Sequence, residues 1–171
     1  MSGRNALGTQ IDVSAEVSAP QPIVVERAMY WFGAFQNWTD AHNSAGVTTT
    51  GTNWAMAEGQ SGGALKYKTF VLIANPSASD ATVQMRLLRE GGRAAVTTGT
   101  FTVPANSRFT CYAGQPGPCQ DAFAQLQDGE MFGISVESLN GTPIVIERAL
   151  YWDGGGESYG AGTNETGVRL K

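Results

Sequence analysis

Residues 22–31 read Pro-Ile-Val-Val-Glu-Arg-Ala-Met-Tyr-Trp, and residues 143–152 repeat this stretch as Pro-Ile-Val-Ile-Glu-Arg-Ala-Leu-Tyr-Trp. Eight of the ten positions are identical, and the two exchanges keep an apolar side chain. The offset of 121 residues continues without a gap on both sides of the stretch. Self-similarity of this kind predicts that one structural element occurs twice. We therefore expect a duplicated hairpin element at residues 8–48 and 129–169, on either side of a central sheet segment at residues 52–121.

Each copy of the element carries the pattern of two β-strands. Upstream of the repeated stretch, apolar residues alternate with polar ones, at Ile11, Val13, Ala15 and Val17 in the first copy and at Phe132, Ile134 and Val136 in the second. A period of two is typical of a half-buried strand. The repeated stretch itself is apolar on both faces, which predicts a central strand covered on both sides. We therefore expect each copy to form a β-hairpin followed by a long glycine-rich loop.

The middle of the chain predicts several more short strands. Strand patterns occur at residues 53–57, 67–74, 82–89, 98–103 and 108–112, and a helical pattern occurs at residues 121–127. Turn-forming residues are frequent, with 22 glycines and 7 prolines. About ten strands at this spacing predict an all-β fold, an Ig-like or Greek-key β-sandwich with at most one short helix. The length suits a single domain at residues 1–171.

Charged residues interrupt the apolar repeated stretch in both copies. They are Glu26 and Arg27 in the first copy and Glu147 and Arg148 in the second. An unpaired charge inside an apolar strand is costly, so each of them is expected to have a partner. We interpret all four as members of structural ion pairs that fix strand register, and not as catalytic groups.

The two cysteines, Cys111 and Cys119, flank a loop that is rich in proline and glycine. Two cysteines are too few for a structural zinc site, and their spacing is too long for a redox-active C-x-x-C pair. We therefore predict a disulfide that closes this loop; the alternative is two unrelated free thiols on a surface loop. Such a disulfide is typical of a protein that matures in an oxidising compartment.

Four motifs follow one another along the chain: the repeated stretch, Trp54-Ala-Met-Ala-Glu-Gly59, Phe70-Val-Leu-Ile-Ala-Asn-Pro76 and Val103-Pro-Ala-Asn-Ser-Arg108. Together they resemble a bacterial tandem repeat that occurs in large secreted and cell-surface proteins and forms a family of unknown function. The resemblance covers nearly the whole chain. It implies an extracellular, all-β module that is repeated along a longer polypeptide, with no assigned activity and no known catalytic residues.

Composition and charge argue against two classes of partner. With 15 acidic and 11 basic side chains the net charge is −4, so the chain has no basic surplus for binding nucleic acid. No apolar run approaches the roughly 20 residues that span a bilayer, so membrane insertion is not expected.

The chain offers little for catalysis or for metal binding. The single histidine, His42, lies between Asp40 and Ser44, but residues so close along a chain rarely form a catalytic triad. Oxygen-rich segments at residues 153–157 and around Asp40 and Asn43 do not match the spacing of a calcium loop. We therefore expect no enzymatic activity, no catalytic residues, no metal site and no cofactor.

Large aromatic side chains flank several glycine-rich segments and indicate a surface for binding glycans. Extracellular β-sandwiches stack sugars on such rings, while asparagine and carboxylate side chains bind the sugar hydroxyls. The candidate contacts are Trp38, Tyr159, Trp54, Asp40 and Asn43. Trp31 and Trp152 end the repeated stretches and are expected in the core.

Two functions follow from these patterns. The preferred one is a non-enzymatic structural module of a secreted or cell-surface bacterial tandem-repeat protein. It would self-assemble through the duplicated hairpin, with neighbouring repeats or copies of itself as partners. The alternative is a carbohydrate-binding module or adhesin domain that binds polysaccharide through the loop aromatics.

Overall fold

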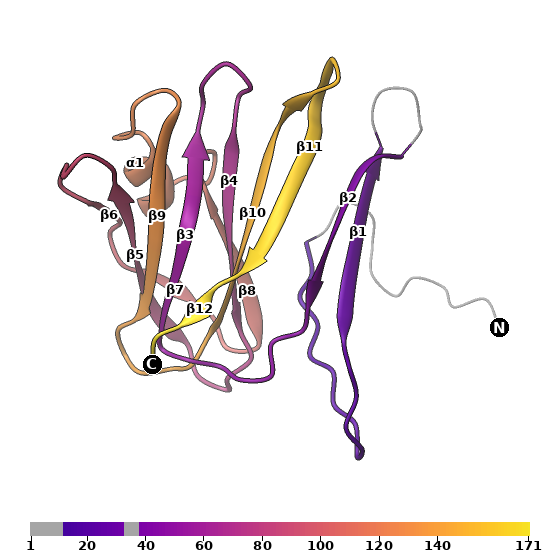
Figure 1. The fold of residues 1–171 in the computed structure, drawn as a ribbon. Helices are drawn as coiled ribbons and strands as arrows, with labels where there is room; N and C mark the ends of the chain where they lie inside the picture. The colour runs from indigo at the N-terminus through magenta and orange to yellow at the C-terminus, as the bar shows by residue number, and fades with distance from the viewer. Residues whose placement is uncertain (1–11, 33–37) are drawn as a thin grey trace.

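The computed structural model describes residues 12–32 and 38–171. Twelve β-strands and one helix of six residues make up the described chain, which confirms the expected all-β sandwich (Figure 1). All strand pairs are antiparallel, in sheets of four, six and two strands. Within the described residues, the one helix is α1 (Pro118–Phe123), which is too short to cross a bilayer.

The four-stranded sheet has the order β11 (Glu157–Thr166), β10 (Val145–Gly154), β4 (Lys68–Asn75) and β8 (Ser107–Tyr112). The strand β10 is internal because β11 and β4 pair with its two edges. Successive side chains of β4 are alternately buried and more exposed, which is the period of two of a strand with one face on the core.

The six-stranded sheet forms the other layer. Its order is β12 (Val168–Arg169), β3 (Asn53–Ser61), β9 (Glu130–Ser138), β5 (Ala81–Arg89) and β6 (Val96–Thr97), with β7 (Phe101–Val103) also paired to β5. Apolar side chains from the inner faces of both sheets form one core, which includes Trp54, Val71, Ile73, Met85, Leu87, Ile134 and Ile146. Burial of these side chains is the main stabilising contribution to the sandwich.

A third, two-stranded sheet lies outside this sandwich. It consists of β1 (Glu26–Phe32) and β2 (Trp38–Ala45), and β2 lies beside β11 (Figure 1). We call the pair β1–β2 the first hairpin and the pair β10–β11 the second hairpin. Residues 12–25 lead into the first hairpin and form no strand.

Three expectations about the duplicated element are wrong. Residues 12–17 form no strand, although their duplicates lie in β9 (Ile11 lies outside the described residues). The strands β9 and β10 lie in different sheets, so they do not form a hairpin with each other. The segments expected as glycine-rich loops instead contribute the second strands, β2 and β11. The hairpin of each copy is therefore formed one strand later in the chain than expected.

The reason for these differences is that a strand needs a hydrogen-bonded neighbour as well as an apolar pattern. The strand β9 pairs with β3 and β5, whereas within residues 12–32 and 38–171 no second pair of such strands lies beside the first copy. For the same reason β10 is an internal strand, as expected, with β11 and β4 on its two edges. Its duplicate β1 pairs with β2 on one edge and is not an internal strand among the described residues. A period of two alone does not supply the partner strand.

The disulfide between Cys111 and Cys119 is confirmed. It joins the end of β8 to the first turn of α1, and both cysteines are buried. The helix expected at residues 121–127 begins earlier, at Pro118, because proline is well suited to the first turn, where its missing N–H has no helical partner.

Candidate functional site

The first and second hairpins have the same strand register. Glu26 pairs with Ala45 and Glu147 pairs with Thr166, so the offset of 121 residues holds in the pairing as well as in the sequence. The backbone hydrogen bond just beyond each hairpin is also repeated, with N···O distances of 2.8 Å in the first copy and 2.9 Å in the second. The repeat is therefore a repeat of structure.

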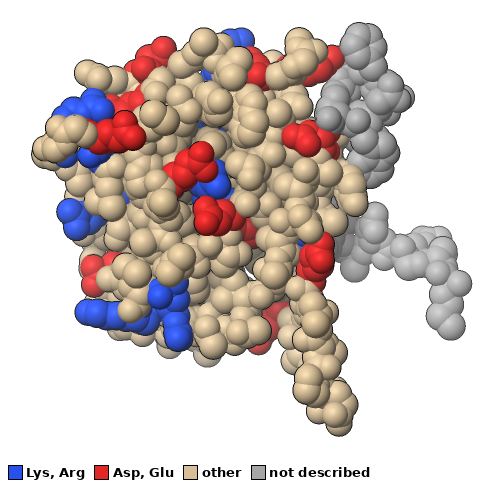
Figure 2. All heavy atoms as spheres, viewed as in Figure 1, with Lys and Arg blue, Asp and Glu red and all other residues tan. Residues whose placement is uncertain are grey.

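The two copies differ in how much apolar surface they bury. In the second copy three isoleucines are fully buried, namely Ile134, Ile144 and Ile146. Their duplicates are exposed, by 50% at Val13, 53% at Ile23 and 37% at Val25. Residues 17–25 carry no charge and project away from the sandwich as an uncharged tip (Figures 1 and 2). The first copy therefore presents to solvent the apolar positions that the second copy places in the core.

The second hairpin is completed by β4, whereas the first hairpin is not. Residues 145–150 of the second copy pair with residues 69–74 of β4. The corresponding edge of the first copy, residues 24–29, has no partner strand within residues 12–32 and 38–171. The peptide groups of an open edge are a template for pairing with another strand.

The first hairpin lies against the outer face of the second. Arg27 forms an ion pair with Glu147. The ring of Trp31 meets the ring of Tyr151 edge to face, with 5.4 Å between the centroids. Because Glu147 and Tyr151 alternate with the buried Arg148, these contacts lie on the side of the sheet that faces away from the core.

His42 takes part in the same contact. Its Nε2 lies 3.1 Å from the hydroxyl oxygen of Tyr151. Burial lowers the pKa of His42 below 6.5, and the nearby charge of Arg27 lowers it further, while Glu147 and Asp40 oppose the shift. Burial also raises the pKa of Tyr151 above 10.0. Both side chains are therefore neutral at pH 7, and their contact is a neutral hydrogen bond.

The structure does not assemble a catalytic triad around His42. Asp40, His42 and Ser44 share one face of β2, but among the described residues no hydrogen bond joins them. Within the same part of the chain, no group of three His, Cys, Asp or Glu side chains is placed to hold a metal ion. Absence of enzymatic activity stays a prediction.

Three of the four charged residues expected in ion pairs have them, namely Arg27, Glu147 and Arg148. Arg148 is 2% exposed and lies 3.4 Å from a carboxylate oxygen of Glu58 and 3.6 Å from one of Glu165. Glu26 instead accepts a hydrogen bond of 2.6 Å from the amide of Asn43. The same amide-to-carboxylate bond recurs in the second hairpin.

The prediction that Trp54 contacts a glycan is wrong. It is 2% exposed because its position in β3 points into the core, where its indole N–H donates to the carbonyl of Gly51 at 3.1 Å. Trp38 begins β2, but its side chain lies outside the described part of the chain.

Asp40 and Asn43 are engaged within the hairpins. The carboxylate of Asp40 accepts hydrogen bonds from the backbone N–H groups of Ala41 at 2.8 Å and Gly162 at 2.9 Å. Asn43 binds Glu26, as described above. These two side chains fix the hairpins instead of converging with Tyr159 on one ligand site.

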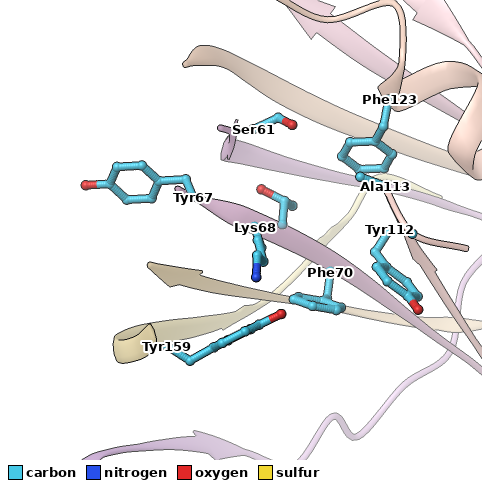
Figure 3. Close-up of a pocket in the computed structure, with 10 residues that line it drawn as sticks. Ser61, Tyr67, Lys68, Phe70, Tyr112, Ala113, Phe123 and Tyr159 are labelled. Carbon is cyan, nitrogen blue, oxygen red and sulfur yellow. The ribbon is translucent and has the colours of Figure 1, made fainter. Parts of the chain in front are cut away.

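Tyr159 lines a pocket of about 280 Å³ at one end of the four-stranded sheet (Figure 3). Its backbone φ of 57° is one that tyrosine rarely adopts. The ammonium of Lys68 lies 3.9 Å from the centroid of its ring. Five aromatic residues line this pocket, which we call the end pocket: Tyr67, Phe70, Tyr112, Phe123 and Tyr159.

Lys68, Phe70 and Tyr112 were not predicted as site residues. Lys68 and Phe70 share the outer face of β4, and Tyr112 of β8 pairs with Phe70. The rings of Phe70 and Tyr112 stack on each other, with 4.9 Å between their centroids. The alternation along β4 is visible in the sequence, but the pairing of β4 with β8 is not. The sequence therefore gives no indication that these three residues meet.

No protein-family model matches this sequence, and no curated protein matches it significantly. Among solved structures, the chain is similar to protein 1070 of Thermotoga maritima, with a TM-score of 0.55 and 13% identity over 71% of this chain and 97% of the other. A sensory rhodopsin transducer from Anabaena matches with a TM-score of 0.45 and 23% identity, over 60% of this chain and 91% of the other. At 13% identity the first likeness is one of fold alone.

Proposed function

We propose that this chain is a non-enzymatic structural module of a bacterial secreted or cell-surface protein built from tandem repeats. The first hairpin completes the sandwich of a neighbouring unit, by pairing β1 with the β4 of that unit. The neighbour is the preceding repeat of a longer polypeptide, or another copy of the chain. In another copy both edges of β4 are already paired, with β10 and β8, so the first hairpin joins that copy by displacing its second hairpin. Units joined in this way form a rod in which each contacts only its neighbours.

The contrast in burial between the two copies carries this proposal. Val13, Ile23 and Val25 are exposed, whereas their duplicates are fully buried against the rest of the sandwich. Full burial of an aliphatic side chain contributes about 1.5–3 kcal/mol relative to exposure. A preceding repeat in which this place is vacant would therefore bind the first copy favourably.

The register of the hairpins supports the mode of pairing. Because β1–β2 reproduces the pairing of β10–β11, β1 can take the place of β10 beside a β4 strand without rearrangement of the hairpin. Each molecule has two such hairpins and one β4 strand. Exchange between copies therefore passes from one molecule to the next and builds open chains instead of closed dimers.

The disulfide supports the proposed location. A buried disulfide that ties β8 to α1 persists in oxidising surroundings, such as the outside of a bacterial cell, and is rare in the cytosol.

Assembly is tested by light scattering coupled to size exclusion over a wide concentration range, without reductant. We expect the mass to rise above 18.1 kDa in steps as the concentration increases. Ile23→Asp should abolish this rise, because it places a charge where the duplicate is fully buried, while the monomer tolerates it at an exposed position. The matched control is Val47→Asp, because Val47 and its duplicate Val168 are both exposed.

Either of two results would contradict assembly between copies. One is a strict monomer at every concentration. The other is an Ile23→Asp variant that assembles as the unchanged protein does.

The second candidate function is glycan binding, and one observation favours it. Tyr159, which the sequence proposes as a sugar contact, is 38% exposed and lines a pocket together with four other aromatic residues. Aromatic faces are good platforms for sugars because they offer apolar area beside a polar group.

A further inference from the structure

We propose that the end pocket binds an acidic sugar residue, the uronic acid unit of an anionic polysaccharide. The ammonium of Lys68 would pair with the carboxylate of the sugar, and the aromatic side chains that line the pocket would pack against the sugar ring. This site goes beyond the structural role proposed above and does not depend on it. It gives the second candidate function a location and a ligand class.

The shape of the end pocket suits one sugar unit. Its volume of about 280 Å³ lies just below the roughly 300–1,000 Å³ that is usual for small-molecule sites. Three elements meet there, because β4 begins at Lys68, β8 ends at Tyr112 and β11 begins just before Tyr159.

The lining of the end pocket is rigid and aromatic. Phe70 stacks on Tyr112 with an angle of 26° between the ring planes. The ring centroids of Tyr159 and Tyr151 lie 5.9 Å apart. The disulfide next to Tyr112 holds the loop that forms one wall. Figure 3 shows the rings of Phe70 and Tyr159 near the ammonium of Lys68. Such preorganisation lowers the entropic cost of binding.

Charge decides between an acidic and a neutral sugar. The pocket is lined by one cation, Lys68, and by no carboxylate of the described residues. None of the ion pairs between described residues includes Lys68; the nearby Asp153 pairs with Lys66 at 3.0 Å, and the charge of Lys68 contributes only a smaller part to the lowering of the Asp153 pKa. An ammonium held over an aromatic ring in this way is available for a carboxylate, and such a charge-assisted hydrogen bond is stronger than a neutral one.

The backbone of Tyr159 has a φ of 57°, in the left-handed region that Lys66 and Asn106 also adopt. The unusual conformation places the ring beneath Lys68, where both line the pocket.

The test is calorimetric titration of the full chain with two tetrasaccharides of equal length, tetragalacturonate and the neutral cellotetraose. We expect tetragalacturonate to bind, and cellotetraose to bind at least about tenfold more weakly. Lys68→Gln should weaken tetragalacturonate binding by about tenfold or more. The matched control Lys171→Gln removes the same charge at an exposed position that does not line the pocket, and it should leave the affinity unchanged.

Tyr159→Gly provides a second variant, because glycine tolerates positive φ and the change removes the ring without adding strain. It should weaken both tetrasaccharides. Equal affinity for the acidic and the neutral sugar, or an unchanged affinity of Lys68→Gln, would overturn the assignment of an acidic ligand. If neither tetragalacturonate nor a tetramer of mannuronate binds, the site itself is overturned. These titrations do not test assembly. Assembly is tested separately, by how the mass from light scattering changes with protein concentration.

Discussion

At the scale of single residues, the carboxylate of Glu130 is a buried charge whose oxygens are held by several hydrogen bonds. Its side chain is 1% exposed and receives two hydrogen bonds from Arg89, at 2.6 and 3.0 Å, and one from the backbone N–H of Gln127 at 2.7 Å. The hydrogen bond from Arg89 is the main cause that lowers the pKa of Glu130 from 4.5 to about 2. Glu130 therefore fixes the start of β9 as a charged group.

Glu130→Gln should destabilise the fold by about 1–3 kcal/mol, because it leaves the guanidinium groups of Arg89 and Arg93 beside a neutral side chain where the carboxylate is 1% exposed. Urea denaturation at pH 7 measures this change. Glu137→Gln is the matched control, since Glu137 is exposed on the same strand, and it should alter the free energy of unfolding by no more than about 0.5 kcal/mol. A loss that is equal for both variants would contradict the structural role of Glu130.

Glu130 also gives the fold a dependence on acid pH. Because its pKa is lowered in the folded state, its contribution to stability is present above the ordinary pKa of 4.5 and is lost as the pH falls toward about 2. Denaturation of Glu130→Gln should show a smaller loss of stability between pH 5 and pH 2 than the unchanged protein does.

His42 should make the docking of the first hairpin weaken as the pH falls below about 6.5. Its pKa is lowered when it is buried against Tyr151, so an undocked His42 takes up a proton more readily and docking weakens as the pH falls below 6.5. Hydrogen exchange of the β2 amides measures docking. His42→Gln, which does not titrate, should remove most of this dependence, and a dependence that persists in the variant would contradict it.

The sequence predicts the chemistry of single residues better than their surroundings. It gives Arg27 and Glu147 as members of ion pairs, but not that these two pair with each other across the two copies. It offers Trp54 as a surface aromatic, whereas its place in β3 buries it. Both outcomes depend on which strands become neighbours, and that information is not local.

At the scale of elements, residues 12–25 and their duplicates show how neighbours decide structure. In the second copy the same pattern contributes to β9 and β10, each paired on two sides. In the first copy residues 12–25 form no strand and their apolar side chains are exposed. A similar sequence therefore has two structures in one molecule, because backbone pairing stabilises a strand more than its own propensity does.

The disulfide is the element-scale feature that the sequence predicts most directly, because two cysteines allow one pairing. Reduction should lower the free energy of unfolding by about 2–3 kcal/mol, the amount expected for a loop of this length. Urea denaturation with and without reductant measures this change. The variant with Cys111→Ala and Cys119→Ala serves as control, since its stability should not respond to reductant.

At the scale of the whole molecule, alternation and turn residues predict the all-β sandwich and several strand bounds closely. The strands expected at residues 67–74, 82–89 and 108–112 occur as β4, β5 and β8 within one residue at each end. The division into two sheets and the exclusion of the first hairpin from both were not predictable. They depend on contacts between residues far apart in the chain, as does the end pocket.

The role of the repeated hairpin can be understood only from the whole molecule. The chain holds one complete sandwich and a second copy of the hairpin that completes it. If the first hairpin belongs to a preceding repeat, supplying that repeat should give residues 12–25 the strand partners that they lack.

Hydrogen exchange on a two-repeat chain measures this most directly. In that chain residues 46–124 are placed directly ahead of residues 4–171, which preserves the offset of 121 residues. We expect the amides of residues 13–17 and 23–25 to become protected relative to the 171-residue chain, because a second set of β3, β4 and β5 strands is then available to pair with them. Equal and rapid exchange of these amides in both chains would contradict the proposal that the first hairpin completes a neighbouring unit.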